Sequence, residues 1–179
     1  MIEKLGITKY KVVEADIDET MPDFMNASDA VQMVALKKAQ EVAHRVDEDS
    51  VIVAADTIVV FDGNRLGKPE DESDAFAMLN MLSGMWHEVM TGVAIIKDGQ
   101  ELVACETTRV KFRELDPHEI EAYIASEEPM DKAGAYGAQG LGSLFVERIE
   151  GDFYNVMGLP LYRLGQMLAQ IGMNPLDRY

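Results

Sequence analysis

Residues 51–69 read VIVAADTIVVFDGNRLGKP, an apolar run that contains one acid, Asp56, and ends in a turn. A continuous apolar run that is rich in β-branched residues and bounded by turn residues predicts a buried strand over 51–61. Burying a carboxylate costs on the order of several kcal/mol unless another group pairs with it. Asp56 therefore needs either a structural partner or a chemical task.

Helices and further strands are expected on both sides of this strand. A helix is predicted over 27–46, because apolar residues recur there every three or four positions after a capping Asn26 or Ser28. Residues 1–7 read as the last turns of a helix that ends at Gly6. The same patterns predict helices over 70–82, 116–126 and 159–172, and strands over 9–16, 87–98, 100–112 and 141–151. This alternation, with an antiparallel pair in the middle, predicts an α/β fold in which helices flank a mixed sheet.

The composition limits the classes of function. The chain has 179 residues, 47% of them hydrophobic, which fits one compact domain with a real core or two small lobes that share one core. Its formal charge of −16 argues against binding nucleic acid or an anionic membrane with the whole surface. A nucleotide is still compatible, because a small polyphosphate can enter a local basic pocket or arrive with a divalent cation. The chain has no apolar stretch long enough to cross a bilayer and no secretory signal at its N-terminus, so a cytoplasmic location is expected.

Four polar residues lie against apolar sequence and are candidates for chemistry: Glu19, Lys38, Asp56 and Lys68. Two carboxylates and two lysines suit a site for a metal-bound polyphosphate, in which acids bind the cation and lysines neutralise phosphate oxygens. An acid near the metal can also orient a water for attack on phosphorus. The alternative is structural: Asp56 accepts hydrogen bonds from a neighbouring loop, Lys38 faces water, and Glu19 belongs to a solvated turn. Residue types and spacing leave both interpretations open.

A glycine-rich stretch over 131–152, DKAGAYGAQGLGSLFVERIEGD, is the second candidate. Its glycines allow a tight loop to approach a ligand, where Gln139 can hydrogen-bond a base edge and Lys132 can contact phosphate. The glycines can equally serve only to turn the chain before a strand, and the stretch matches no standard phosphate-binding motif. The three histidines are too scattered for a metal site, and we expect them on the surface: His44, His87 and His118.

Longer motifs, in order along almost the whole chain, carry a resemblance to a known family. They include ADIDE (15–19), KKAQEVA (37–43), VIVAADTIVVFDG (51–63) and, most specifically, the stretch from 131 to 164 that begins DKAGAYGAQG. These motifs resemble the Maf family of nucleoside triphosphate pyrophosphatases. The resemblance implies one domain over 1–179, with the architecture that Maf proteins share with inosine triphosphatases.

The resemblance also implies an activity and roles for residues. Family members hydrolyse a nucleoside triphosphate between its α and β phosphates with a divalent cation, Mg²⁺ or Mn²⁺, in a house-cleaning or nucleotide-pool role. The AGAYG-x-QG form is similar to that of the branch that acts on dTTP and UTP. A homodimer is a further expectation from the family. By motif, Asp56 would activate water or hold the metal, Glu19 would be a second metal ligand, Lys38 and Lys68 would hold phosphate, and Thr57 and Gln139 would help to choose the base.

The chain departs from the family pattern at two places. Family members usually begin with an apolar strand and a Ser-x-Ser-Pro-Arg-Arg loop whose side chains contact the triphosphate, and this chain begins after that loop. Met33 also stands where an arginine is common. We favour a start codon that was assigned too late, and we expect the first strand of the sheet to be missing. The alternative is a short form with impaired catalysis, a nucleotide-binding or regulatory protein linked to cell division through the family's association with septum formation.

Overall fold

The computed structural model describes residues 1–178, which form two compact units. The first unit contains residues 1–56, 91–106 and the chain from 158 onward. The second unit contains residues 57–90 and 107–157. Within residues 1–178, no helix has the length and apolar character that a membrane span requires.

Five strands form one sheet in the described chain, in the order β2-β1-β3-β4-β5. Their bounds are Ile52–Phe61 (β1), Asn64–Leu66 (β2), Trp86–Lys97 (β3), Gln100–Phe112 (β4) and Val146–Glu150 (β5). The predicted α/β class with a helix-flanked sheet is confirmed, but the sheet is antiparallel and the expectation of a mixed sheet was wrong. Tight turns at Asp62-Gly63 and Asp98-Gly99, with positive φ at all four residues, reverse the chain between β1 and β2 and between β3 and β4.

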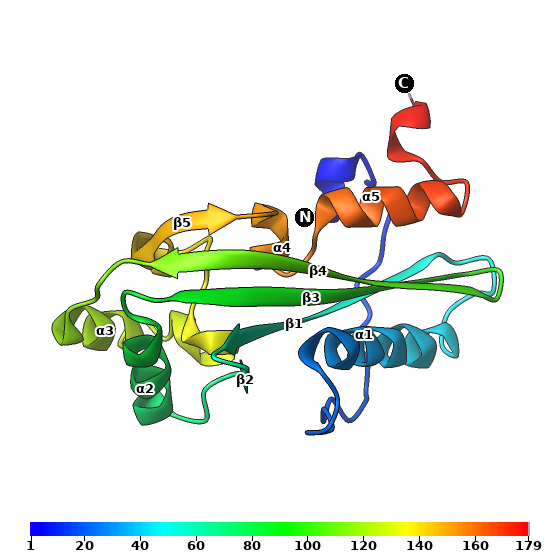
Figure 1. Cartoon of the computed structure of the whole chain (residues 1–179). Helices are drawn as coiled ribbons and strands as arrows, with labels where there is room; N and C mark the ends of the chain where they lie inside the picture. Colours follow the sequence, from blue (N-terminus) through cyan, green and yellow to red (C-terminus); the bar gives the residue numbers. More distant parts are fainter. Residues whose placement is uncertain (179) are drawn as a thin grey trace. The chain divides into compact units, whose positions relative to one another are not determined.

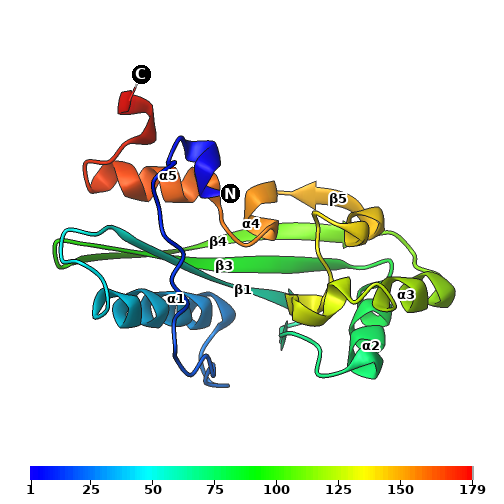
Figure 2. The same ribbon diagram turned by 180° about the vertical axis from the view of Figure 1, so that it is seen from behind.

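In the first unit, two helices cover opposite faces of the strands (Figures 1 and 2). Helix α1 (Ala27–Ala43) packs on one face, where it buries residues such as Ala35 against Ile52 and Ala94. Helix α5 (Leu161–Gln170) packs on the other face, against side chains that alternate with these along the same strands. The approach of α1 is close, because a Cβ added at Gly92 of β3 would lie 2.2 Å from the carbonyl oxygen of Val31.

The N-terminal segment of the first unit differs from its prediction. A single 3₁₀ turn, Ile2–Leu5, ends at Gly6 in the left-handed conformation, which agrees with the predicted helix end. The strand predicted over 9–16 is absent, and this prediction was wrong. Val13 and Ala15 pack against the α1 core, but Val12 is 84% exposed. Alternating apolar residues make a strand only where a neighbouring strand accepts their backbone hydrogen bonds.

The second unit has its own core. Helices α2 (Glu72–Leu82) and α3 (Pro117–Ile124) pack on each other, and Leu79, Phe112 and Ile120 are fully buried there. Helix α3 begins with the predicted proline at its first position and a capping box between Asp116 and Glu119. The second unit also contains the short helical segments Glu128–Asp131 (η2), Ala133–Ala135 (η3), Leu141–Phe145 (η4) and Phe153–Val156 (α4). A last short turn, Pro175–Arg178 (η5), belongs to the first unit.

His87 corrects the expectation of surface histidines. Its side chain is 3% exposed, whereas His44 and His118 are exposed as expected. The cause is the two-residue period of β3, which turns His87 and Val89 to the same buried face. The Nε2 atom lies 2.8 Å from the Tyr136 hydroxyl, and Nδ1 has no hydrogen-bond partner among the described residues.

Candidate active site

Three of the predicted site residues meet in the first unit. The Nζ atom of Lys38 donates a hydrogen bond to Oδ1 of Asp56 at 2.7 Å and lies 3.0 Å from Oε1 of Glu19. Asp56 comes from β1, Lys38 from α1, and Glu19 from the extended segment before α1. Side chains from three parts of the chain therefore form one cluster of two carboxylates around an ammonium.

The packing of α1 on the strands explains why Lys38 reaches Asp56. Ala35 and Ala39, on the buried face of α1, have no exposed surface, and this small face lets the helix lie close to β1. Lys38 lies beside that face, so its aliphatic stem can run along the strand while its ammonium meets the carboxylate. The side chains of Lys38 and Asp56 are 20% and 10% exposed, against 53% for Glu19. Asp56 is thus the sheltered member of the cluster and Glu19 the accessible one.

The electrostatics of the cluster favour its charged form. Burial alone would lower the pKa of Lys38, but the hydrogen bonds and charges of Asp56 and Glu19 outweigh it, so the pKa of Lys38 is raised. Lys38 therefore stays protonated at neutral pH and supplies the positive charge that an ionised carboxylate on β1 requires. Lys38 is thus the structural partner that Asp56 needs in the apolar strand. The same contacts bring the charges of Asp56, Lys38 and Glu19 together at one place.

The resemblance implies a divalent cation. The carboxylates of Glu19 and Asp56 can therefore be tested as ligands for it. Within residues 1–178, no group of three or more His, Cys, Asp or Glu side chains is placed to hold a metal. Glu19 and Asp56 share Lys38 and supply hard oxygen ligands from two sides. Mg²⁺ commonly uses only one or two carboxylates together with waters and substrate phosphates. The pair fits a cation that arrives with a polyphosphate, and it does not fit a cage made by protein alone.

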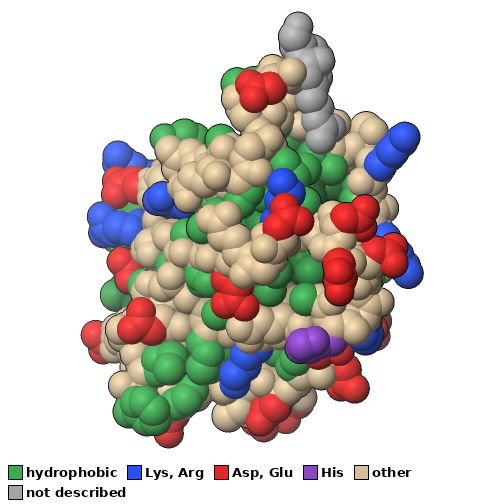
Figure 3. Space-filling model, turned by 90° about the vertical axis from the view of Figure 1, so that its right-hand side faces the viewer, with side chains coloured by type: hydrophobic (Ala, Val, Ile, Leu, Met, Phe, Trp, Pro, Cys, Tyr) green, Lys and Arg blue, Asp and Glu red, His purple; other side chains and the backbone are tan. Residues whose placement is uncertain are grey.

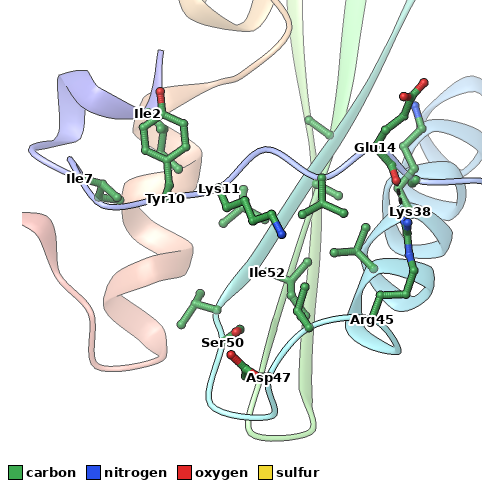
Figure 4. Close-up of a pocket in the computed structure, with 18 of the residues that line it drawn as sticks. Ile2, Ile7, Tyr10, Lys11, Glu14, Lys38, Arg45, Asp47, Ser50 and Ile52 are labelled. Carbon is green, nitrogen blue, oxygen red and sulfur yellow. Dashed lines mark hydrogen bonds between the residues drawn. The ribbon is translucent and has the colours of Figure 1, made fainter.

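A pocket of about 1030 Å³ lies beside the cluster in the first unit, and both Glu19 and Lys38 line it. Figure 4 shows the extended segment that carries Tyr10, Lys11 and Glu14 along this pocket, with Lys38 and Arg45 from the region of α1. The Arg45 guanidinium donates to the Glu41 carboxylate and to the Glu14 carbonyl oxygen, so it ties the segment to the end of the helix. Lys9 and Lys11 line the pocket together with Lys38. The pocket therefore presents cationic groups, although the chain has a net charge of −16.

The distribution of charge on the surface can be compared with the cationic groups of the pocket. Figure 3 shows one face of the molecule, on which acidic side chains are scattered among Lys, Arg and apolar side chains and do not form one continuous field. The negative charge is thus spread out on this face. A spread-out charge repels an anionic ligand less at close range than a concentrated one does, because solvent and salt screen distant charges.

The other predicted site residues lie in the second unit. Lys68 is exposed, and the half-buried Lys132 pairs with Asp131 at 2.6 Å. The pKa of Asp131 is lowered, first by the hydrogen bond from Lys132 and in smaller part by the charge of Lys68. The two predicted phosphate ligands therefore act on the same carboxylate. The backbone also joins their segments, because the amide of Gly134 donates to the carbonyl oxygen of Gly67 at 2.9 Å.

The remaining predicted residues are Thr57, which is half-buried in β1, and Gln139, which is exposed on the loop between η3 and η4. The structure thus joins Glu19 with Lys38 and Asp56, and Lys68 with Lys132. Asp131 was missed by sequence reasoning, although it lies directly before Lys132 in a motif that carried the resemblance.

Comparison with known proteins agrees with these observations. Residues 1–171 match the family described as Maf-like protein. A protein of Syntrophomonas wolfei subsp. wolfei named dTTP/UTP pyrophosphatase is 53% identical over 178 residues, which cover 98% of this chain and 93% of that protein. A protein of the same name from Bacillus cereus (strain ATCC 10987 / NRS 248) is 45% identical over 174 residues, covering 97% and 85%. Another, from Caldicellulosiruptor bescii, is 45% identical over 177 residues, covering 96% and 88%.

Proposed function

The chain belongs to the Maf family, and we propose that it hydrolyses dTTP and UTP to the nucleoside monophosphate and pyrophosphate. The observation that carries the proposal is the cluster of Asp56, Lys38 and Glu19, which supplies a sheltered carboxylate, a fixed positive charge and a second, accessible carboxylate. The names of relatives that are 45–53% identical over nearly the whole chain support the substrate class.

In the proposed reaction, Asp56 orients a water and accepts its proton as the water oxygen bonds to the α-phosphorus. The bond from the α-phosphorus to the oxygen that bridges to the β-phosphorus breaks, and pyrophosphate leaves with that oxygen. Lys38 holds the Asp56 carboxylate in place by a hydrogen bond of 2.7 Å before the reaction, and it neutralises charge on the phosphate oxygens during it. Phosphoryl transfer depends mainly on positioning and charge stabilisation, which this cluster provides.

Glu19 and Asp56 would hold a divalent cation together with oxygens of the substrate. The cation would supply charge neutralisation at the phosphates when it is bound. Glu19 suits this role because its exposed carboxylate can leave Lys38 and turn to the cation at little cost. We propose Mg²⁺ or Mn²⁺, since carboxylate and phosphate oxygens are the ligands that both prefer.

We assign contacts with the substrate to the other predicted residues. Lys68 and Lys132 bind phosphate oxygens, and both lie near Asp131, which holds them in one region in the absence of substrate. Gln139 hydrogen-bonds the base, with Thr57 assisting. An amide offers both a donor and an acceptor, and the Watson–Crick edges of thymine and uracil present both kinds of partner.

The test is product analysis with the full chain. Each nucleoside triphosphate is incubated with Mg²⁺ or Mn²⁺, and the nucleotide and phosphate products are separated. We expect dTTP and UTP to give the monophosphate and pyrophosphate faster than other triphosphates. A folded sample that forms the diphosphate and inorganic phosphate, or that hydrolyses neither substrate, would contradict the proposal.

A further inference from the structure

The carboxylate of Glu128 lies inside the turn that carries Gln139. Its Oε2 atom accepts a hydrogen bond from the amide of Leu141 at 2.8 Å, and its Oε1 atom accepts one from the amide of Gly142 at 3.1 Å. Glu128 is the first residue of η2, thirteen positions before Leu141. One side chain therefore satisfies two backbone donors that lie two and three positions after Gln139, the predicted base-reading residue.

The start of the same turn is held through a second side chain. The Tyr123 hydroxyl donates to Oε1 of Glu128 at 2.9 Å and accepts from the amide of Gly137 at 3.0 Å. Tyr123 is 4% exposed, and its ring packs edge-on against Phe145. The two ends of the turn, before and after Gln139, are thus connected to one carboxylate.

The space around this carboxylate is closed. A Cβ added at Gly140 would lie 2.3 Å from Oε2 of Glu128. A Cβ added at Gly142 would lie 2.7 Å from both the Gly137 carbonyl oxygen and the Tyr123 hydroxyl oxygen. The turn can wrap around Glu128 this tightly only because both positions lack a side chain.

Glu128 is charged in this environment. Burial raises its pKa, but the hydrogen bonds from Leu141, Gly142 and Tyr123 outweigh burial, so the pKa of Glu128 is lowered. A charged acceptor holds backbone donors more strongly than a neutral one. The turn is therefore fixed at neutral pH.

Gln139 is exposed on this fixed turn. Its side-chain amide has no hydrogen-bond partner within residues 1–178, so the direction in which it points depends on the backbone that carries it. We propose that Glu128 is a positioning residue for Gln139 and that it thereby sets the preference for thymine and uracil over cytosine. This inference rests on the base-reading role assigned to Gln139 in the proposed function.

The experiment measures kcat/KM for dTTP and for dCTP with the full chain, and the ratio is the readout. Glu128→Gln keeps the size of the side chain but replaces one accepting oxygen with a donor, so at least one loop amide loses its partner. We expect the ratio to fall about tenfold, mainly through a higher KM for dTTP. The matched control is Glu127→Gln, a neighbouring exposed acid, which should leave the ratio unchanged.

A double mutant separates positioning from stability. If Glu128 acts through Gln139, Glu128→Gln changes the ratio in the native background and has no further effect on it in a Gln139→Ala background. Tyr123→Phe, which removes the hydroxyl and keeps the ring, is the second variant if Glu128→Gln does not fold, and it should lower the ratio by a smaller factor. An unchanged ratio would overturn the positioning role, even if activity toward both substrates falls by the same factor.

The outcome also separates this inference from the proposed function. If Gln139→Ala lowers the ratio and Glu128→Gln does not, only the positioning role fails. If Gln139→Ala leaves the ratio unchanged, the base-reading role fails, and the positioning role fails with it. If the native chain does not hydrolyse dTTP, the same variants are compared by calorimetric binding of dTTP and dCTP, where the same loss of preference is expected.

Discussion

The ammonium of Lys38 lies 2.7 Å from a carboxylate oxygen of Asp56, and Asp56 lies in the middle of the apolar strand β1. This pair explains how β1 tolerates an acid, because each charge stabilises the other where water is scarce. Glu19 extends the pair at the more exposed end. The same arrangement places a positive charge against the carboxylate that we propose to accept a proton from water.

Removing Lys38 should destabilise the protein as well as inactivate it. In Lys38→Met, Asp56 keeps its place but loses a charged partner, and we expect the free energy of unfolding at pH 7 to fall by about 2 kcal/mol. The measurement is urea unfolding, with the rate of pyrophosphate release from dTTP measured in parallel. Lys37→Met is the control, since Lys37 is the adjacent, exposed lysine. Equal behaviour of the two variants would remove Lys38 from both roles.

His87 should make stability depend on pH. Burial lowers its pKa from 6.5 to about 4, so between these values the unfolded chain binds a proton that the folded chain does not. The stabilisation is fully present above pH 6.5 and is lost as the pH falls toward 4, by about 3 kcal/mol in all. Urea unfolding between pH 4.5 and 7.5 measures the slope. We expect a flatter slope for His87→Phe, and an unchanged one for His118→Gln, which replaces an exposed histidine.

Gly92 should be required for the docking of α1. An added Cβ would lie 2.2 Å from a backbone oxygen of α1, so Gly92→Ala must push the helix away from β3. We expect a loss of about 1–3 kcal/mol in the free energy of unfolding, with a loss of activity because Lys38 moves with the helix. Gly165→Ala in α5 has open space for its Cβ and should be neutral or slightly stabilising. A thermal melt of both variants decides the point, and a fully stable Gly92→Ala protein would contradict the packing argument.

Glu19 should affect the cation more than the chemical step. Activity is expected to disappear on chelation of divalent ions and to return on addition of Mg²⁺ or Mn²⁺. In Glu19→Gln, the half-saturating Mg²⁺ concentration should rise about tenfold, while kcat at saturating Mg²⁺ changes little. Titration of Mg²⁺ at fixed dTTP measures both quantities. A Mg²⁺ dependence identical to that of the native chain would exclude Glu19 as a ligand.

Much of the fold could be predicted because its signals are local. The apolar run of β1, the period of α1 after Asn26 and the turn at Asp98-Gly99 depend on residues close together in the chain. The failures were non-local. A strand over 9–16 needs a neighbouring strand, which its own sequence does not reveal, and the burial of His87 depends on the register of β3.

In the candidate site too, local features could be predicted and contacts between distant residues could not. Residue types indicated Glu19, Lys38 and Asp56, but their meeting depends on how closely α1 packs on the strands, and spacing along the chain cannot give that distance. The turn around Gln139 could be recognised by its glycines. Glu128 could not, because its role arises from contacts with residues thirteen and fourteen positions away.

The most direct test of the central claim is the rate of pyrophosphate release from dTTP by Asp56→Asn, compared with Asp62→Asn. Asp62 directly follows the same strand, in an exposed turn, and takes no part in the proposed chemistry, so the two variants differ only in which carboxylate is lost. We expect Asp56→Asn to be slower than the native chain by about 10²–10⁴-fold while it remains folded, and Asp62→Asn to match the native rate. Native activity in a folded Asp56→Asn protein would contradict the assignment of Asp56 as the residue that activates water.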